Sequence, residues 1–162
     1  MLEFAIPTPE NQADYERLFL HAQVQRWLRP PPLPPLDEIE VAGMLHVDVA
    51  QWDDRGYGRW VVRDAGTGDF VGRAGLSDYQ LDGRAEVELA WAVLPERWGQ
   101  GIATEAARAA LAYAREIPLR ELIAFTLPNN AASLRVMEKI GMRRIGPVEH
   151  AGLSHILYRI DT

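Results

Sequence analysis

The chain has 162 residues, a formal net charge of −6 at pH 7 and no cysteine. This length predicts a single domain, residues 1–162. The lack of cysteine excludes a disulfide framework and a thiolate nucleophile, and the acidic balance argues against general nucleic-acid binding. Because no apolar run is long enough to span a membrane, we expect a cytoplasmic protein with no membrane partner.

The N-terminal third predicts one strand and two helices. Residues 2–6 alternate weakly between apolar and polar, which is typical of a short strand, and residues 8–27 carry apolar side chains at helical spacing. The proline-rich residues 29–36 predict an extended loop. Asp37 and Glu40 then stand at the spacing of a capping box and predict the start of a second helix.

The middle of the chain predicts three antiparallel strands. Residues 60–63 and 70–76 are separated by a glycine-containing turn, which indicates a hairpin. A second glycine turn, at residues 81–83, leads into a strand that begins near Glu86 and alternates as far as Val93.

A glycine turn follows this strand and leads into a helix that begins near Ile102. The first backbone N–H groups of a helix have no partner inside it and lie at the positive end of its dipole. Such a helix start suits a phosphate or pyrophosphate. Gly99 and Gly101 would let the backbone approach the anion without an intervening Cβ atom.

The glycine turn departs from two other phosphate-binding patterns. A P-loop needs Lys after its last glycine, and Ile102 stands there. The dinucleotide fingerprint needs a third glycine where Thr104 stands, although Glu121 does lie about 20 residues further on. The antiparallel strands before the turn also differ from the parallel order with which a Rossmann domain begins.

The last third predicts a strand, a helix and two more strands. Residues 121–127 are mostly apolar and are expected to lie parallel to the strand before the glycine turn. Residues 129–140 predict a capped helix, and the final strands are expected around residues 142–145 and 155–160. This order of elements predicts an α+β fold.

Two stretches resemble the GNAT superfamily of acetyl-CoA-dependent N-acetyltransferases. WGQGIATEA after LPER is similar to motif A of that family, with Gly101 and Ala103 matching and Trp98 in the Gln/Arg place, as in the RimJ/RimL-like branch of ribosomal-protein N-terminal acetyltransferases. PNNAASLRVMEKIGM is similar to the Asn-x-x-Ser helix of the family. The resemblance implies a GNAT fold, a mixed and mostly antiparallel sheet of about six to seven strands, flanked by helices, with a central pair of parallel strands that splay apart.

The resemblance also implies that acetyl-CoA binds as a co-substrate. The glycine turn would hold its pyrophosphate, backbone N–H groups near the end of the preceding strand would contact the thioester oxygen, and Asn130 would contact the pantetheine arm or else cap its helix. The implied cofactor-binding residues are Ala92, Val93, Leu94, Trp98, Gly99, Gln100, Gly101, Ile102, Ala103, Thr104 and Asn130.

Acetyl transfer to an amine further needs a base and an acid, because a primary amine is largely protonated at neutral pH and only its neutral form attacks. Glu88 aligns with the acidic residue that family members use as the base, and Glu86 lies two residues away; both could instead belong to a solvated strand face. The usual tyrosine acid of the family falls at Met137. Ser133 matches the serine that is proposed to act as the acid instead of the tyrosine. Alternatively, its hydroxyl forms a hydrogen bond with the helix backbone.

The implied acceptor is an amine, either a small molecule or a protein N-terminus, that attacks directly in a ternary complex. Candidate walls of its pocket are Trp27, residues 30–36, Trp52 and Tyr79. A non-catalytic, regulatory acetyl-CoA-binding module with the same fold is the alternative, and a homodimer is a tendency of the family. No metal is expected, because the histidines are scattered in the sequence, at positions 21, 46, 150 and 155.

Overall fold

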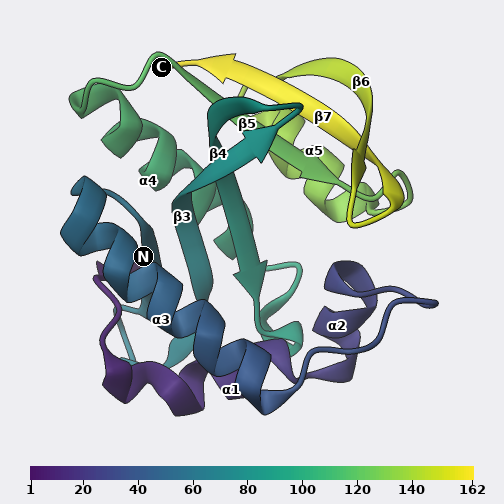
Figure 1. The fold of residues 1–162 in the computed structure, drawn as a ribbon. Helices are drawn as coiled ribbons and strands as arrows, with labels where there is room; N and C mark the ends of the chain where they lie inside the picture. The colour runs from purple at the N-terminus through teal and green to yellow at the C-terminus, as the bar shows by residue number, and fades with distance from the viewer.

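The computed structural model describes all residues, 1–162, and its seven strands form one sheet in the order β1-β2-β3-β4-β5-β7-β6 (Figure 1). Only β4 and β5 pair in parallel, and every other pair is antiparallel. The predicted α+β fold is therefore confirmed.

In chain order the elements are β1 (Leu2–Ala5), α1 (Gln12–Phe19), α2 (Ala22–Leu28), α3 (Glu38–Arg55), β2 (Arg59–Asp64), β3 (Phe70–Leu81), β4 (Arg84–Val93), α4 (Ile102–Glu116), β5 (Glu121–Thr126), α5 (Ala131–Lys139), β6 (Arg143–His150) and β7 (Leu153–Asp161), with short 3-10 turns at Pro9–Asn11 and Pro95–Arg97.

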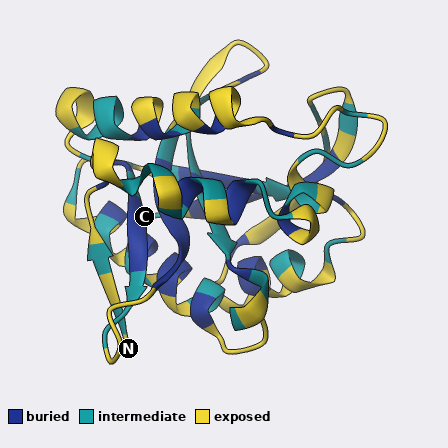
Figure 2. Ribbon diagram, turned by 90° about the horizontal axis from the view of Figure 1, so that it is seen from below, coloured by how far each residue is buried: buried dark blue, intermediate teal, exposed yellow.

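Helices cover both faces of the sheet, because successive side chains of a strand point to opposite faces. In β2, Trp60 packs in a core formed with α4 and α5, whereas its neighbour Val61 packs against α1 and α3. Figure 2 shows the buried residues along the strands and the inner sides of the helices, with exposed residues on the outer sides. None of the helices is both long and apolar enough to cross a membrane.

The predicted first helix is divided in two, which corrects the sequence analysis. After the 3-10 turn, α1 ends at Phe19 and α2 begins at Ala22. His21 lies between them in an extended conformation, and its Nδ1 accepts a hydrogen bond of 3.2 Å from the N–H of Gln23. The apolar spacing continues across this break, so periodicity alone gave no sign of it. The predicted capping box of Asp37 and Glu40 is present at the start of α3.

The parallel pair at the centre of the sheet is the feature that creates space for a site. β4 and β5 pair only where Glu88 lies opposite Ile123. Beyond that point β4 continues to Val93 and β5 to Thr126 without any further pairing. The carboxyl ends of the two strands therefore separate and leave a gap in the middle of the sheet.

Candidate functional site

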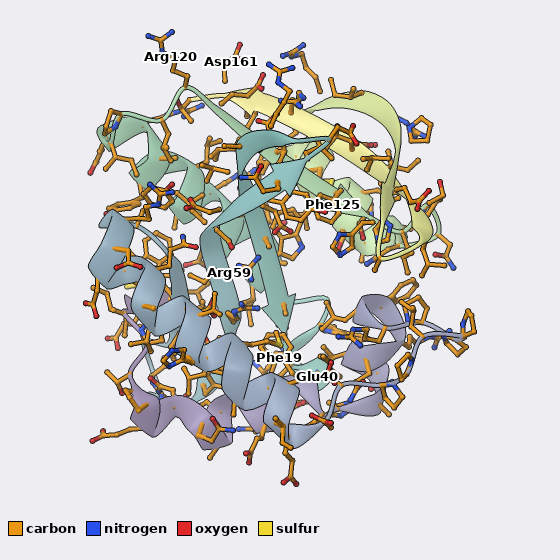
Figure 3. All side chains as sticks on the ribbon, viewed as in Figure 1. Phe19, Glu40, Arg59, Arg120, Phe125 and Asp161 are labelled. Carbon is orange, nitrogen blue, oxygen red and sulfur yellow. The ribbon has the colours of Figure 1, made fainter.

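A cavity of about 770 Å³ lies at this gap. The ends of β4 and β5, the starts of α4 and α5, the helix α2 and the β6–β7 hairpin supply its walls, and Arg59 and Phe125, which line it, lie toward the middle of the molecule in Figure 3. Two predicted site residues, Leu94 and Gln100, do not line this cavity. The predicted site residues that do line it are Glu88, Ala92, Val93, Trp98, Gly99, Gly101, Ile102, Ala103, Thr104, Asn130 and Ser133.

The glycine turn presents a row of unpaired N–H groups to the cavity. Gly99 and Gly101 have φ angles of +76° and +80°, in the left-handed region that favours glycine. A Cβ atom at either position would meet no other atom within 4 Å, so the space beside the turn is open. The backbone N–H groups of residues 99–104 donate no hydrogen bond to any protein acceptor. A helix start with free donors and open space fits the pyrophosphate of a coenzyme A group.

Side-chain contacts hold the glycine turn in place. The indole Nε1–H of Trp98 donates to the carbonyl oxygen of Val93 at 2.8 Å. Arg97 donates from Nε to Oε1 of Gln100 at 2.9 Å and from Nη2 to Oδ2 of Asp64 at 2.6 Å. The contact with Arg97 also lowers the pKa of the Asp64 carboxyl. Trp98 and Gln100 therefore support the turn through their side chains.

The N–H groups at the end of β4 face two different neighbours, and this corrects the prediction for Leu94. The N–H of Leu94 donates to the carbonyl oxygen of Val71 at 2.9 Å, so it is already paired with β3. In an antiparallel pair successive N–H groups alternate between the two sides of the strand. The N–H of Ala92 therefore also faces β3, whereas that of Val93 faces the gap. Of the three predicted donors, Val93 alone remains.

Asn130 and Ser133 lie together at the start of α5. The Oδ1 atom of Asn130 accepts a hydrogen bond of 3.3 Å from the N–H of Ser133, so Asn130 caps the helix. The Ser133 hydroxyl forms no hydrogen bond within the protein, although the sequence had left backbone bonding open as an alternative. Met137 is 1% exposed, and its thioether carries no proton to donate. Ser133 is thus the hydroxyl at this wall that is free to act.

Glu88 lines the cavity and is bound to a residue that the sequence analysis missed. Its Oε2 atom accepts a hydrogen bond of 2.9 Å from Nη2 of Arg59, and the two side chains are 15% and 16% exposed. Burial lowers the pKa of the Arg59 guanidinium, with the positive charge of Arg73 acting in the same direction. Glu86 lies outside the cavity, in an ion pair of 2.9 Å with Arg159. Neither carboxylate is on a freely solvated face.

Two histidines that look unrelated in the sequence meet in the cavity wall. His150 and His155 stand on the two strands of the β6–β7 hairpin, with Val148 opposite His155 and ring centroids 5.2 Å apart. Burial lowers the pKa of His150, the charge of His155 lowers it further, and Glu88 opposes the shift. A turn signal at Gly152 between two histidines was the available sign, because a hairpin can bring side chains at diagonal positions of its two strands into contact.

The predicted acceptor walls are only partly correct. Trp27 lines the cavity together with Phe19 and Met44. Trp52 does not line it, because its ring packs against Trp60 and Tyr113 in the core. Tyr79 lies behind the wall, where its hydroxyl is 2.7 Å from Nδ1 of His150, and residues 30–36 are outside the cavity.

Comparison with known proteins agrees with this architecture. The family model described as "Acetyltransferase (GNAT) domain" matches residues 5–143. Uncharacterized protein YkkB of Bacillus subtilis (strain 168) is 39% identical over 95 residues, 57% of this chain and 55% of its own, so the match spans about half the length of that relative. An acetyltransferase structure from Agrobacterium tumefaciens str. C58 has a TM-score of 0.81 at 24% identity, covering 98% of this chain and 90% of its own. The structure of yncA from Salmonella typhimurium with its cofactor acetyl-CoA has a TM-score of 0.74 at 20% identity, covering 99% and 92%.

Proposed function

Because the chain belongs to the GNAT acetyltransferase domain family, we propose that it transfers the acetyl group of acetyl-CoA to a primary amine by direct attack in a ternary complex. One observation carries this proposal: Gly99 and residues 101–104, whose N–H groups are unpaired, line a cavity at the gap between β4 and β5. They offer the anion site that the cofactor needs, beside strand ends where a thioester can lie.

Bound acetyl-CoA supplies a thioester carbonyl carbon that an amine can attack. The chain holds the pyrophosphate at the start of α4, through N–H groups at the positive end of the helix dipole. The N–H of Val93 points to the gap, where it can donate to the thioester oxygen. Such a fixed donor accelerates transfer because that oxygen gains negative charge only in the transition state.

Ser133 is the proposed acid for the departing thiolate. We expect Ser133→Ala to lower kcat about tenfold. The effect is modest because a thiol has a pKa of about 8.5, so its thiolate is a good leaving group even without an acid. The Kd for acetyl-CoA, measured by calorimetry, should stay unchanged, since the backbone cap by Asn130 does not use the hydroxyl. Ser154→Ala is the control, because Ser154 is exposed and lies outside the cavity. An unchanged kcat in Ser133→Ala would remove Ser133 from this role.

Glu88 is the base that the resemblance implies, and its ion pair with Arg59 suggests a second role in holding the cationic amine. In Glu88→Gln the unpaired guanidinium of Arg59 would repel an ammonium group. We expect the KM for the amine to rise about tenfold while the Kd for acetyl-CoA stays unchanged, as steady-state kinetics and calorimetry would measure. A fall in kcat that disappears at high pH, with KM unchanged, would instead make Glu88 the base.

The proposed function is tested by acetyl-CoA calorimetry, followed on the same sample by thiol release with small amines and N-terminal peptides. The peptides are included because the resemblance to the RimJ/RimL-like branch extends to enzymes that act on protein N-termini. Binding with turnover on one acceptor supports acetyl transfer and identifies the acceptor class. Binding without turnover supports the binding-module alternative, and no binding rejects the proposed anion site.

A further inference from the structure

We propose that His155 is the residue that takes the proton from the acceptor amine. The inference rests on the proposed acetyl transfer and adds a catalytic residue that the sequence did not point to.

His155 lies where the gap in the sheet opens. β7 pairs with β5 so that Ile156 is opposite Thr126, the last residue of β5. The preceding residue, His155, therefore sits just past the carboxyl end of β5, where β4 and β5 are no longer paired. The side chain lines the cavity, is only 8% exposed as a residue, and has the ring of Phe125 at 5.8 Å between centroids.

A backbone carbonyl orients the His155 ring and sets its tautomer. Nδ1 lies 2.9 Å from the carbonyl oxygen of Leu153. A carbonyl oxygen can only accept, so Nδ1 must carry the hydrogen. In the neutral ring the lone pair is then on Nε2, which has no hydrogen-bond partner in the protein and is not sealed from solvent. An imidazole held in this way is ready to accept a proton.

The neighbours of His155 keep a second positive charge away from it. His150 lies edge to face with His155, and burial together with His155 lowers the pKa of His150, so His150 is neutral at pH 7. The titratable groups that face His150 are Tyr79 from β3, Glu88 from β4 and His155 from β7. Burial raises the pKa of the Tyr79 hydroxyl, which therefore stays protonated and bonded to His150. His150 therefore places no positive charge beside His155.

Glu88 is less free than His155 to take this proton. One of its oxygens is already bound by the guanidinium of Arg59 at 2.9 Å, whereas Nε2 of His155 is bound by no protein group. In the proposed step the N–H bond of the ammonium breaks as Nε2 gains the proton. The freed lone pair attacks the thioester carbon, the C–N bond forms and the C–S bond breaks. The thiolate takes the proton of the Ser133 hydroxyl, Ser133 regains a proton through water from the second N–H bond of the former ammonium nitrogen, and the proton on His155 leaves to solvent.

The test is a comparison of three proteins: wild type, His155→Gln and the control His46→Gln, whose histidine is exposed on α3 away from the cavity. Glutamine keeps a polar side chain that can donate a hydrogen bond but cannot take up a proton. With the amine or peptide that the wild type acetylates best, we expect His155→Gln to lower kcat about 100-fold or more at pH 7. The loss should shrink toward pH 10, near the pKa of about 10.4 of a lysine-like amine, because a neutral amine needs no base.

The two controls are measured on the same samples. The Kd for acetyl-CoA should be the same in all three proteins, and His46→Gln should keep the kcat and pH profile of the wild type. If the wild type turns over and His155→Gln keeps its kcat and pH profile, the inference is overturned while the proposed function stands. If the wild type acetylates no amine in the panel, the proposed function fails and the inference falls with it.

A measurement without turnover guards against a variant that fails to fold. The imidazole tautomers of the wild-type protein can be read from long-range ¹H–¹⁵N correlation spectra. We expect His155 to carry its hydrogen on Nδ1 in the neutral state, and a hydrogen on Nε2 would overturn the inference. In the turnover assay, free imidazole should restore part of the activity of His155→Ala, whereas a purely structural role for His155 predicts no such rescue.

Discussion

Asp48→Ala should lower the free energy of unfolding by about 3–5 kcal/mol, because removing one partner of a buried ion pair leaves the other charge unpaired. Asp48 is 3% exposed and accepts two hydrogen bonds from Arg73, at 2.6 Å from Nε and 2.9 Å from Nη2. It also accepts one of 2.6 Å from the hydroxyl of Tyr15, which is fully buried. Alanine would leave a buried guanidinium and a buried hydroxyl without partners. Urea unfolding followed by far-UV circular dichroism measures the loss.

The surface of the protein offers a matched control for this experiment. Asp78 is bound by the same pair of residue types, with Nε of Arg55 at 2.7 Å and the hydroxyl of Tyr57 at 2.6 Å, but it is 39% exposed. We expect Asp78→Ala to change the unfolding free energy little, because water can replace both contacts. Equal losses in the two variants would contradict the argument from burial. Asp48→Asn keeps the shape of the site and an acceptor oxygen, so it should fall between Asp48→Ala and the wild type.

Gly101→Asp should weaken acetyl-CoA binding about 100-fold. Two like charges about 5 Å apart repel by roughly 3 kcal/mol at an effective dielectric constant of about 20, and 1.4 kcal/mol corresponds to a tenfold change in Kd. Gly101 is the N-cap of α4, and its neighbours in the turn carry the unpaired N–H groups. A carboxylate there would repel the pyrophosphate. Calorimetry with acetyl-CoA, and with free coenzyme A as a second ligand, measures the change.

Gly83→Asp controls for charge and for backbone strain in this experiment. Gly83 has a φ of +77°, close to the +80° of Gly101, but it lies in the turn between β3 and β4, outside the cavity. Aspartate tolerates this left-handed conformation better than most residues, so both variants should fold. We expect Gly83→Asp to bind acetyl-CoA as the wild type does. If Gly101→Asp also binds normally, the glycine turn does not hold the pyrophosphate.

Glu88→Gln and His155→Gln together separate acceptor binding from proton removal. The first should mainly raise the KM for the amine, and the second should mainly lower kcat in a pH-dependent way. Both side chains line one cavity, so a loss in only one kinetic parameter per variant would assign each residue its own step. If Glu88→Gln instead lowers kcat in a pH-dependent way and His155→Gln instead raises the KM, Glu88 is the base, as the resemblance implies.

The elements and the glycine turn with its free N–H groups followed from the sequence because they depend on neighbours along the chain. Alternation from Glu86 to Val93 predicted β4, and helical spacing after Ile102 predicted α4. The two glycines at positions 99 and 101 marked a turn that needs positive φ, and both have it. A row of free N–H groups at the start of α4 is a consequence of helix geometry, so the sequence alone could indicate it.

The tertiary structure decided everything that depends on pairing between distant segments. The register of β4 with β3 decides which N–H groups at the end of β4 are free. Because of this register, the N–H of Leu94 is paired with β3, and Val93 is the one predicted donor to the thioester oxygen that remains. The ion pair of Glu88 with Arg59 joins residues 29 positions apart, and His155 reaches the cavity through the pairing of β7 with β5. Local sequence patterns record the period of a strand or helix, but they carry no information about which strand lies beside it or which side chain it meets. The glycine turn and its free N–H groups could therefore be predicted from the sequence, whereas the Arg59 partner of Glu88 and the position of His155 in the cavity wall could be identified only in the folded protein.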